Sequence, residues 1–260
     1  SPRFPAEFLS PPLLCASRQN ELDQSTGGRP VILSRLDLNL RSHAVIRDLS
    51  DCQQMHRTIL NAFPSAGAAP RREFALLFRV ECASAGDPYV MVQSREIPDY
   101  GHLPAGYISS PPKIKDVSES YASLRSAMRL RFRLRANPTR KIDTKSGPGG
   151  ERRNGRRVDL RSDEERLGWF ARKAAGAGFE IRSVRCSAEV PDVRLAAQGR
   201  TIGFRADAGG EFRKLTFGAV LFEGVIQVTD PAKLRAAIES GIGSAKAYGF
   251  GLLSVAPFEG

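Results

Sequence analysis

The sequence predicts an α+β fold, because segments with the two-residue alternation of strands are interleaved with segments of helical spacing. In the first half, the expected order is a strand (31–40), a helix (50–63), two strands (73–81 and 89–94), a short helix and a strand (128–138). A helix, two strands, a helix and a strand follow in the second half, without a visible sequence repeat. The order β-α-β-β-α-β is typical of a ferredoxin-like domain. We therefore expect two tandem ferredoxin-like (RRM-like) domains.

In the first half, apolar spacing predicts the leading strand and helix. Within residues 31–40, one parity carries Ile32, Leu36, Leu38 and Leu40. Within residues 50–63, helical spacing relates Cys52, Met55, Ile59 and Phe63. Asp48 or Ser50 can cap this helix, and His43 falls in the preceding loop. Residues 84–88 (SAGDP) predict a hairpin turn, and His102 falls in the Pro/Gly-rich segment 98–112.

In the second half, capping signals predict the helices. Ser162 and Glu165 form a capping box for a helix over residues 164–177. Asp230 and Pro231 begin a helix that ends at Ser240. The strands are expected at 179–188, 213–218, 219–228 and 252–257, with the middle pair continuous or bulged at Gly218.

The chain divides into four expected regions. Residues 1–30 are rich in Pro, Ser, Gly and Gln, and we expect a disordered extension or non-native sequence there. The first domain spans 31–138, a flexible basic loop or linker spans 139–158, and the second domain spans 159–260.

The charge balance favours a polyanionic partner. Lys and Arg number 39 against 28 Asp and Glu, so the net charge is +11 and the pI about 10.0. No apolar run approaches the ~20 residues of a membrane-spanning helix, so we expect no membrane partner. The four cysteines lack CxxC and zinc spacing, and no carboxylate cluster is visible. We therefore expect a cytoplasmic protein with reduced thiols, no metal and no cofactor.

Cations concentrate in the middle of the chain. Four arginines alternate with apolar residues in segment 129–135 and therefore share one strand face, and further cations follow to residue 157. The candidate phosphate-binding residues are Arg129, Arg131, Arg133, Arg135, Arg140, Lys141, Arg152, Arg153, Arg156 and Arg157. The alternative is a solvated charged face. The segment lacks the aromatic consensus of an RNA recognition motif, so base stacking on the sheet is not expected.

The segment 241–251 (GIGSAKAYGFG) is a glycine-rich loop between a helix and a strand. It is either a tight connection with a glycine cap or a loop whose N–H groups contact a phosphate. The candidate contacts are Gly241, Gly243, Ser244, Lys246, Gly249 and Gly251. The loop follows a helix and lacks GxxxxGK[ST], which excludes a Walker A motif.

His56 lies at the edge of the apolar stripe of its helix. A histidine in this place is either a partly buried structural residue or a group for proton transfer near neutral pH. An enzyme that acts on RNA needs no more than this, because the 2′-OH of the substrate is the nucleophile.

The segments 132–138 (FRLRANP), 55–56, 82–93, 221–225 and 241–257 together resemble the CasE family of CRISPR repeat endoribonucleases, subunits of Cascade in the RAMP group. The resemblance implies two tandem ferredoxin-like domains and metal-independent cleavage of CRISPR repeat stem-loops in precursor RNA, at the 3′ base of the stem. It further implies 2′,3′-cyclic phosphate and 5′-hydroxyl products and an enzyme that stays bound to the crRNA alongside other Cascade subunits. The family's catalytic histidine corresponds to His56, as base or acid, while Gln53 replaces a tyrosine found in some members.

Two other classes of function remain open from the residues alone. One is a non-cleaving RNA-binding scaffold subunit of a ribonucleoprotein, which would not need His56. The other, more remote, is a DNA-binding protein, although no helix-turn-helix is visible.

Overall fold

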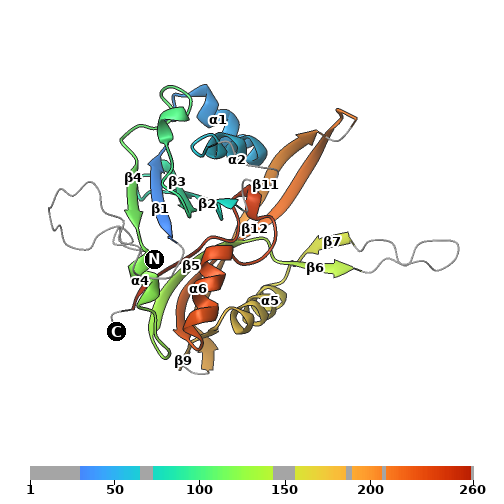
Figure 1. Ribbon diagram of the computed structural model, residues 1–260. Helices are drawn as coiled ribbons and strands as arrows, with labels where there is room; N and C mark the ends of the chain where they lie inside the picture. The colour runs from blue at the N-terminus through green and yellow to red at the C-terminus, as the bar shows by residue number, and fades with distance from the viewer. Residues whose placement is uncertain (1–29, 65–72, 143–155, 186–188, 207–208, 259–260) are drawn as a thin grey trace, which may run out of the picture.

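The computed structural model describes residues 30–64, 73–142, 156–185, 189–206 and 209–258 (Figure 1). Its first part contains one sheet with helices on one side. The elements are β1 (Ile32–Asp37), α1 (His43–Ser50), α2 (Cys52–Leu60), β2 (Leu77–Cys82), β3 (Pro88–Ser94), the 3₁₀ turn η2 (Tyr100–His102), β4 (Lys113–Asp116) and α4 (Ser118–Ala122). The strands pair antiparallel in the order β2-β3-β1-β4. Met55 and Ile59 of α2 pack with Leu36, Phe78 and Val90 of the sheet.

The second part contains a larger sheet and two projecting hairpins. Its elements are β5 (Arg129–Ala136), β6 (Thr139–Ile142), β7 (Arg156–Asp159), α5 (Asp163–Gly176), β8 (Phe179–Ile181), β9 (Ser183–Arg185), β10 (Glu189–Pro191), β11 (Val193–Ala206), β12 (Phe212–Val228), α6 (Pro231–Ser240), η3 (Lys246–Tyr248) and β13 (Leu253–Pro257). The sheet order is β11-β12-β5-β13, and β8 also pairs with β12. Phe132, Phe170 and Phe222 stack in its core. Two sheets with their own helices confirm the α+β fold class.

The strand β5 corrects one expectation. We assigned the segment 128–138 to the first domain, but β5 pairs with β12 and β13 in the second sheet. Its buried residues Leu130, Phe132 and Leu134 pack in the core of that sheet. The fourth strand of the first sheet is β4, which lies in a short polar segment that carries little strand signal.

Two expectations around α2 are also wrong. His43 does not lie in a loop, because it is the first residue of α1. The cap of α2 is neither Asp48 nor Ser50 but Asp51, which accepts from the Gln53 N–H at 2.9 Å. Asp48 is buried in α1 and accepts a hydrogen bond from the Tyr107 hydroxyl at 2.8 Å.

The expected hairpin and caps are confirmed. β2 and β3 pair antiparallel, as the turn at 84–88 predicted. Ser162 and Glu165 form the capping box of α5, and Asp230 caps α6 with Pro231 in its first turn. The strand expected at 179–188 is divided into β8 and β9, and residues 186–188 lie outside the described part.

The region 139–158 is not simply a loop. Its two ends pair as the antiparallel strands β6 and β7, while residues 143–155 lie outside the described part. The prediction for residues 1–30 also falls almost wholly outside it.

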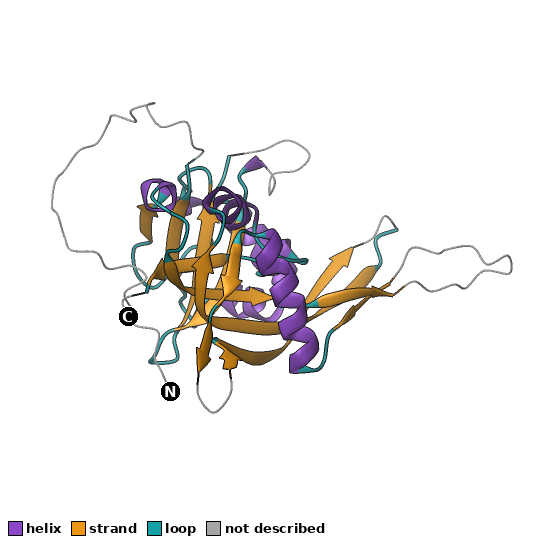
Figure 2. Ribbon diagram, turned by 90° about the horizontal axis from the view of Figure 1, so that it is seen from below, coloured by secondary structure: helices purple, strands orange, loops and turns teal. Residues whose placement is uncertain are grey.

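The strand β11 was not predicted from the sequence, because most of its side chains are exposed or half-buried and show no apolar alternation. It pairs with the continuous strand β12, with a register shift between Ala197 and Arg200. Beyond this shift the two strands project from the sheet (Figures 1 and 2). We call residues 200–206 and 212–218 the β11–β12 arm.

Candidate functional site

His56 lies half-buried in the middle of α2, over the first sheet. Its ring stacks on Phe78 of β2, with 6.3 Å between ring centroids and 13° between planes. Cys52, Met55 and Ile59 fill the buried side of α2, so helical spacing holds His56 at the edge of the core.

The glycine-rich loop reaches the same place from the other end of the chain. Gly241 ends α6 with φ 75°, and a Cβ there would lie 2.9 Å from the Leu77 methyl carbons. A Cβ on Gly249 would lie 3.1 Å from the Phe78 ring. The loop therefore packs on Phe78, whose ring also stacks with His56. The sequence did not predict that the loop and His56 meet, but η3 contacts both α2 and β2.

Several polar groups of the loop hold it in its own domain. The Lys246 ammonium donates to the Ser240 carbonyl at 2.7 Å, at the C-terminal end of α6. The Ser244 hydroxyl lies 3.4 Å from the Asn137 carbonyl oxygen. A Cβ on Gly243 would lie 3.2 Å from the Trp169 ring. The Gly251 N–H donates to the Arg135 carbonyl at 2.8 Å, which ties the loop to β5.

The arginines of β5 share a face, as the alternation predicted, but they differ in their surroundings. Arg129 is exposed, and Arg131 lies 5.5 Å from the Phe258 ring centroid. Arg133 forms ion pairs with Glu81 at 3.1 Å and with Glu223 at 3.0 Å. Arg133 therefore balances one carboxylate from each sheet. The sequence predicted either a phosphate-binding face or a solvated face for these arginines, and neither prediction included such ion pairs.

Arg135 connects β5 to the loop and to β11. It donates to Gln198 at 2.9 Å, Thr201 at 2.7 Å and the Gly249 carbonyl at 3.2 Å. Its guanidinium lies 4.5 Å from the Phe250 ring centroid, and burial lowers its pKa to about 10. Arg135 therefore remains a cation at neutral pH.

A cavity of about 490 Å³ opens beside this arginine. Its walls come from α1, α2, β2, β5, β11 and the glycine-rich loop, and they include Met55, Phe78, Arg135, Thr201 and Tyr248. Residues of both domains thus meet at one cleft next to the His56 helix.

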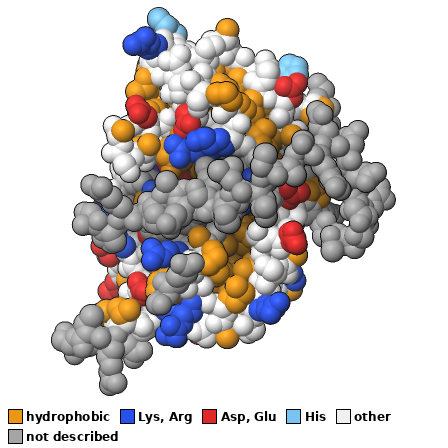
Figure 3. Space-filling view, turned by 90° about the vertical axis from the view of Figure 1, so that its left-hand side faces the viewer, with side chains coloured by type: hydrophobic (Ala, Val, Ile, Leu, Met, Phe, Trp, Pro, Cys, Tyr) orange, Lys and Arg blue, Asp and Glu red, His pale blue; other side chains and the backbone are white. Residues whose placement is uncertain are grey.

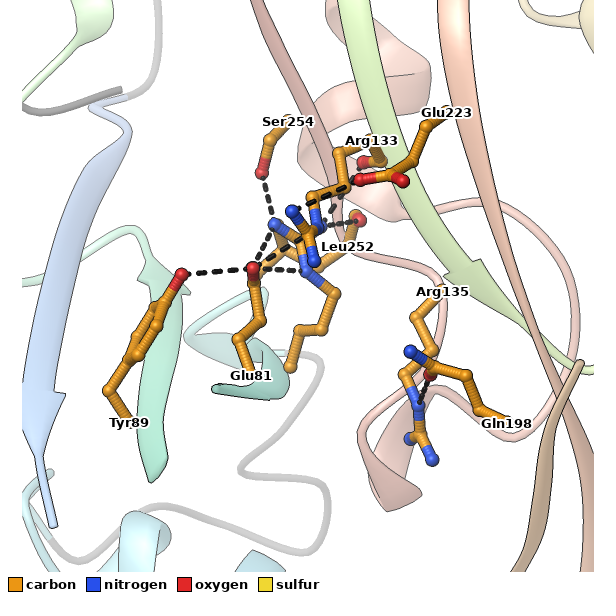
Figure 4. A network of polar contacts seen from close by, with 9 residues as sticks. Glu81, Tyr89, Arg133, Arg135, Gln198, Glu223, Leu252 and Ser254 are labelled. Carbon is orange, nitrogen blue, oxygen red and sulfur yellow. Dashed lines mark hydrogen bonds and ion pairs between the residues drawn. The ribbon is translucent and has the colours of Figure 1, made fainter. Parts of the chain in front are cut away.

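A buried polar network joins the two sheets behind this cleft (Figure 4). Arg79 of β2 is only 3% exposed and donates to Glu81 at 2.7 Å, the Leu252 carbonyl at 2.8 Å and the Ser254 hydroxyl at 3.0 Å. Glu81 also accepts from the Tyr89 hydroxyl at 3.0 Å. Burial by itself raises the pKa of Glu81, but the Arg79 and Arg133 charges and the hydrogen bonds outweigh it, so this pKa lies below its usual value.

The remaining predicted cations lie on or near the β6–β7 hairpin. Arg140, Lys141 and Arg157 are exposed, and Arg140 lies 3.5 Å from Glu165. Arg156 belongs to β7, while Arg152 and Arg153 lie outside the described residues. On the opposite side of the molecule, in Figure 3, the visible Lys and Arg side chains are interspersed with Asp and Glu.

Within the described residues, no three His, Cys, Asp or Glu side chains gather into a group that could hold a metal ion. In the same part of the chain, no helix is long and apolar enough to cross a membrane. The cysteines in this part, Cys52 and Cys82, are both free thiols.

Sequence reasoning missed the residues that connect these pieces. Phe78, Arg79 and Glu81 were assigned only as a strand, although Arg79 and Glu81 have the parity that places both on one face. Arg79 and Glu81 are opposite charges two residues apart in an otherwise apolar strand, and this pattern could have indicated a buried ion pair.

The comparisons with known proteins agree with this arrangement. The family model described as "CRISPR associated protein" matches residues 31–257. The CRISPR-associated endoribonuclease Cse3 of Thermus thermophilus is 36% identical over 86% of this chain and 99% of its own length. The CRISPR system Cascade subunit CasE of Escherichia coli is 31% identical over 80% of this chain and 92% of its own.

The chain belongs to the CasE family of CRISPR-associated proteins. The solved structure of the endoribonuclease Cse3 bound to a 19-nucleotide RNA superposes with a TM-score of 0.68, at 35% identity. The match covers 87% of this CasE family member and 100% of the solved chain, so it includes both sheets.

Proposed function

We propose that this chain is a metal-independent endoribonuclease that cleaves the stem-loop of a CRISPR repeat in precursor crRNA. We further propose that it stays bound to the crRNA as a Cascade subunit in the cytoplasm, where that RNA would be transcribed. The observation that carries the proposal is that His56 and the glycine-rich loop meet at Phe78. The names of the relatives, an endoribonuclease and a Cascade subunit, support it.

In the proposed reaction, the 2′-OH beside the scissile bond attacks the phosphorus and loses its proton, and the bond from phosphorus to the 5′-oxygen breaks. The products are a 2′,3′-cyclic phosphate and a 5′-hydroxyl end, which takes up a proton. His56 acts either as the base for the 2′-OH or as the acid for the 5′-oxygen. A group in this role contributes about 10²–10⁴-fold to the rate.

Positioning must supply much of the remaining rate, because one proton-transfer group does not account for enzymatic acceleration. We assign backbone contact with the RNA to the glycine-rich loop, Arg135 of β5 and the basic hairpin, whereas Arg133 is held by Glu81 and Glu223. Arg135 suits this function because it holds a positive charge at the cleft next to α2.

The decisive variant is His56→Ala, incubated with a labelled repeat hairpin in EDTA. We expect cleavage to fall by about 10²–10⁴-fold while hairpin binding is retained. His102→Ala is the matched control, because His102 is exposed on η2 beside Asp99. Cleavage by His56→Ala at the wild-type rate would exclude His56 as the catalyst.

The same assay separates the remaining alternatives. Loss of wild-type cleavage in EDTA would contradict the metal-independent reaction. A wild-type protein that binds the repeat hairpin tightly but does not cut it would be a scaffold subunit. The residue that favours this alternative is Gln53, which stands where some family members have a tyrosine.

A further inference from the structure

The β11–β12 arm and the β6–β7 hairpin rise from a common root. Asp159 of β7 accepts from the Asn137 amide at 2.9 Å and from the Gly218 N–H at 3.2 Å. The Asn137 amide also donates to the Gly218 carbonyl at 2.9 Å. Both views of the ribbon show the two hairpins projecting from this root toward the same side of the molecule (Figures 1 and 2). They therefore flank one space.

Strand parity shows which face of the arm borders this space. A Cβ on Gly218 would lie 2.9 Å from the Asp159 carboxylate, so the even-numbered positions of β12 in the arm face β7. Phe212 and Lys214 share this parity, and the register places Phe204 directly opposite Lys214. The other face of the arm rests on α2, since a Cβ on Gly203 would lie 2.8 Å from the Cys52 sulfur.

This face combines exposed aromatic rings with positive charge. Phe204 is 41% exposed and Phe212 is 73% exposed. The two rings are diagonal neighbours across the strand pair, close enough for both to contact one ligand. Lys214 lies beside them. On the β6–β7 hairpin, the exposed cations Lys141 and Arg157 share the strand face of Asp159 and therefore lie on the other side of the space. Arg140 has the opposite parity and pairs with Glu165 of α5.

We propose that Phe204 and Phe212 stack on unpaired bases of the bound RNA while Lys214 contacts an adjoining phosphate. This rests on the proposed function, and the part of the RNA that the arm would hold is a stretch of unpaired bases. Exposed aromatic rings next to cations are typical of surfaces that bind single-stranded nucleic acid. The charge on both sides of the space favours a polyanion over an apolar protein surface.

Unpaired bases are the specific partner, because only they offer a ring face for stacking, whereas bases inside a duplex are already stacked. A hairpin RNA has such bases in its loop and in the strands that flank its stem. Both sources present the same chemistry to the two phenylalanines.

The test compares three RNAs: a repeat hairpin with flanking strands, the hairpin without them, and a blunt duplex of the same stem without a loop. Binding is measured for the wild type and for Phe204→Ala/Phe212→Ala. We expect the variant to bind at least one RNA with unpaired bases about 5- to 100-fold more weakly, and the blunt duplex equally well. A loss confined to the flanked RNA identifies the flanks, and a loss shared by both hairpins identifies the loop.

Phe204→Leu/Phe212→Leu keeps apolar side chains but removes the rings, so we expect it to lose affinity as the alanine variant does. Ile97→Ala is the matched control, because Ile97 is 68% exposed in the loop between β3 and η2. Phe212→Ala alone guards against misfolding, because Phe212 is the more exposed ring. We expect it to show part of the loss with an unchanged melting temperature.

Three results would overturn the inference: unchanged binding of all RNAs, an equal loss for the blunt duplex, or full affinity in the leucine variant. In each case the wild type would still bind and cut the hairpin, so the proposed function would stand. If the wild type bound none of the RNAs, the proposed function would fail, and the inference with it.

Discussion

At the residue scale, the contact between Gly203 and α2 links the arm to His56. The Phe204 N–H donates to the Asp51 carboxylate at 3.2 Å, and the same oxygen caps α2 through the Gln53 N–H. A Cβ on Gly203 would lie 2.8 Å from the Cys52 sulfur and 3.3 Å from the Asp51 carboxylate. Because His56 follows Cys52 by about 6 Å along the helix axis, the arm supports the first turn of the helix that carries it.

We therefore expect Gly203→Ala to destabilise the protein by about 1–3 kcal/mol, because an added methyl group in a packed contact forces its neighbours to move. Cleavage of the bound hairpin should fall as α2 shifts. Thermal unfolding and single-turnover cleavage measure the two effects.

The double variant Gly203→Ala/Cys52→Ala should recover a large part of both losses, because it removes the sulfur that the new methyl group meets. Cys82→Ala is the control, since Cys82 is exposed and lies on β2. A double variant no better than Gly203→Ala would contradict this packing account.

The position of His56 at the edge of a buried stripe could be predicted, because helical spacing is a local property of the sequence. The stacking of Phe78 on the His56 ring could not be predicted, because it joins α2 to β2, a strand that lies elsewhere in the sequence. For the same reason, the alternation in 129–135 predicted a shared face for the arginines but not the carboxylates that Arg133 meets.

At the element scale, the β6–β7 hairpin concentrates exposed cations on a two-stranded projection. It contacts the second sheet through the Asn137–Asp159–Gly218 root, so its exposed residues add little to the core. Isolated two-stranded hairpins gain little stability on their own, which favours a binding function for this one.

Replacing Arg140, Lys141 and Arg157 together with alanine should weaken hairpin binding and reduce its salt dependence. Each lost phosphate contact lowers the slope of log K against log salt by about 0.7–0.9. Binding titrations at several salt concentrations measure the slope.

The matched control replaces three exposed cations elsewhere: Arg41, Lys113 and Arg125. It changes the net charge equally but should leave the slope closer to that of the wild type. Equal slopes in the two triple variants would show that the hairpin acts only through total charge.

At the scale of the whole molecule, the network around Glu81 joins the two sheets. Arg79 and Glu81 come from β2, Arg133 from β5 and Ser254 from β13, and Arg79 and Glu81 are buried. A buried charge that loses its partner costs about 3–5 kcal/mol, so these residues constrain how the two sheets sit together. The assignment of β5 to the wrong sheet shows why sequence did not reveal this, since strand pairing depends on distant segments.

The pH dependence of stability should report on Glu81. Because its folded pKa lies below its unfolded value of about 4.3, its contribution is present above that value and is lost as the pH falls through the folded pKa. Glu81→Gln should lower stability at pH 7 and flatten the decline below about pH 5.

The comparison uses Glu180→Gln, which changes an exposed carboxyl group on β8. Denaturant unfolding from pH 7 to pH 3 measures both variants. A decline in Glu81→Gln as steep as that of the wild type would assign the acid sensitivity to other carboxyl groups.

The pairing of β13 with β5 has a consequence for synthesis on the ribosome. The Leu252 carbonyl and the Ser254 hydroxyl complete the surroundings of Arg79, and the Gly251 N–H fixes the loop to β5. All three groups lie about 200 residues after His56 in the sequence. A nascent chain therefore carries His56 long before it can assemble the surface that surrounds it, and we expect RNA cleavage only after β13 has emerged.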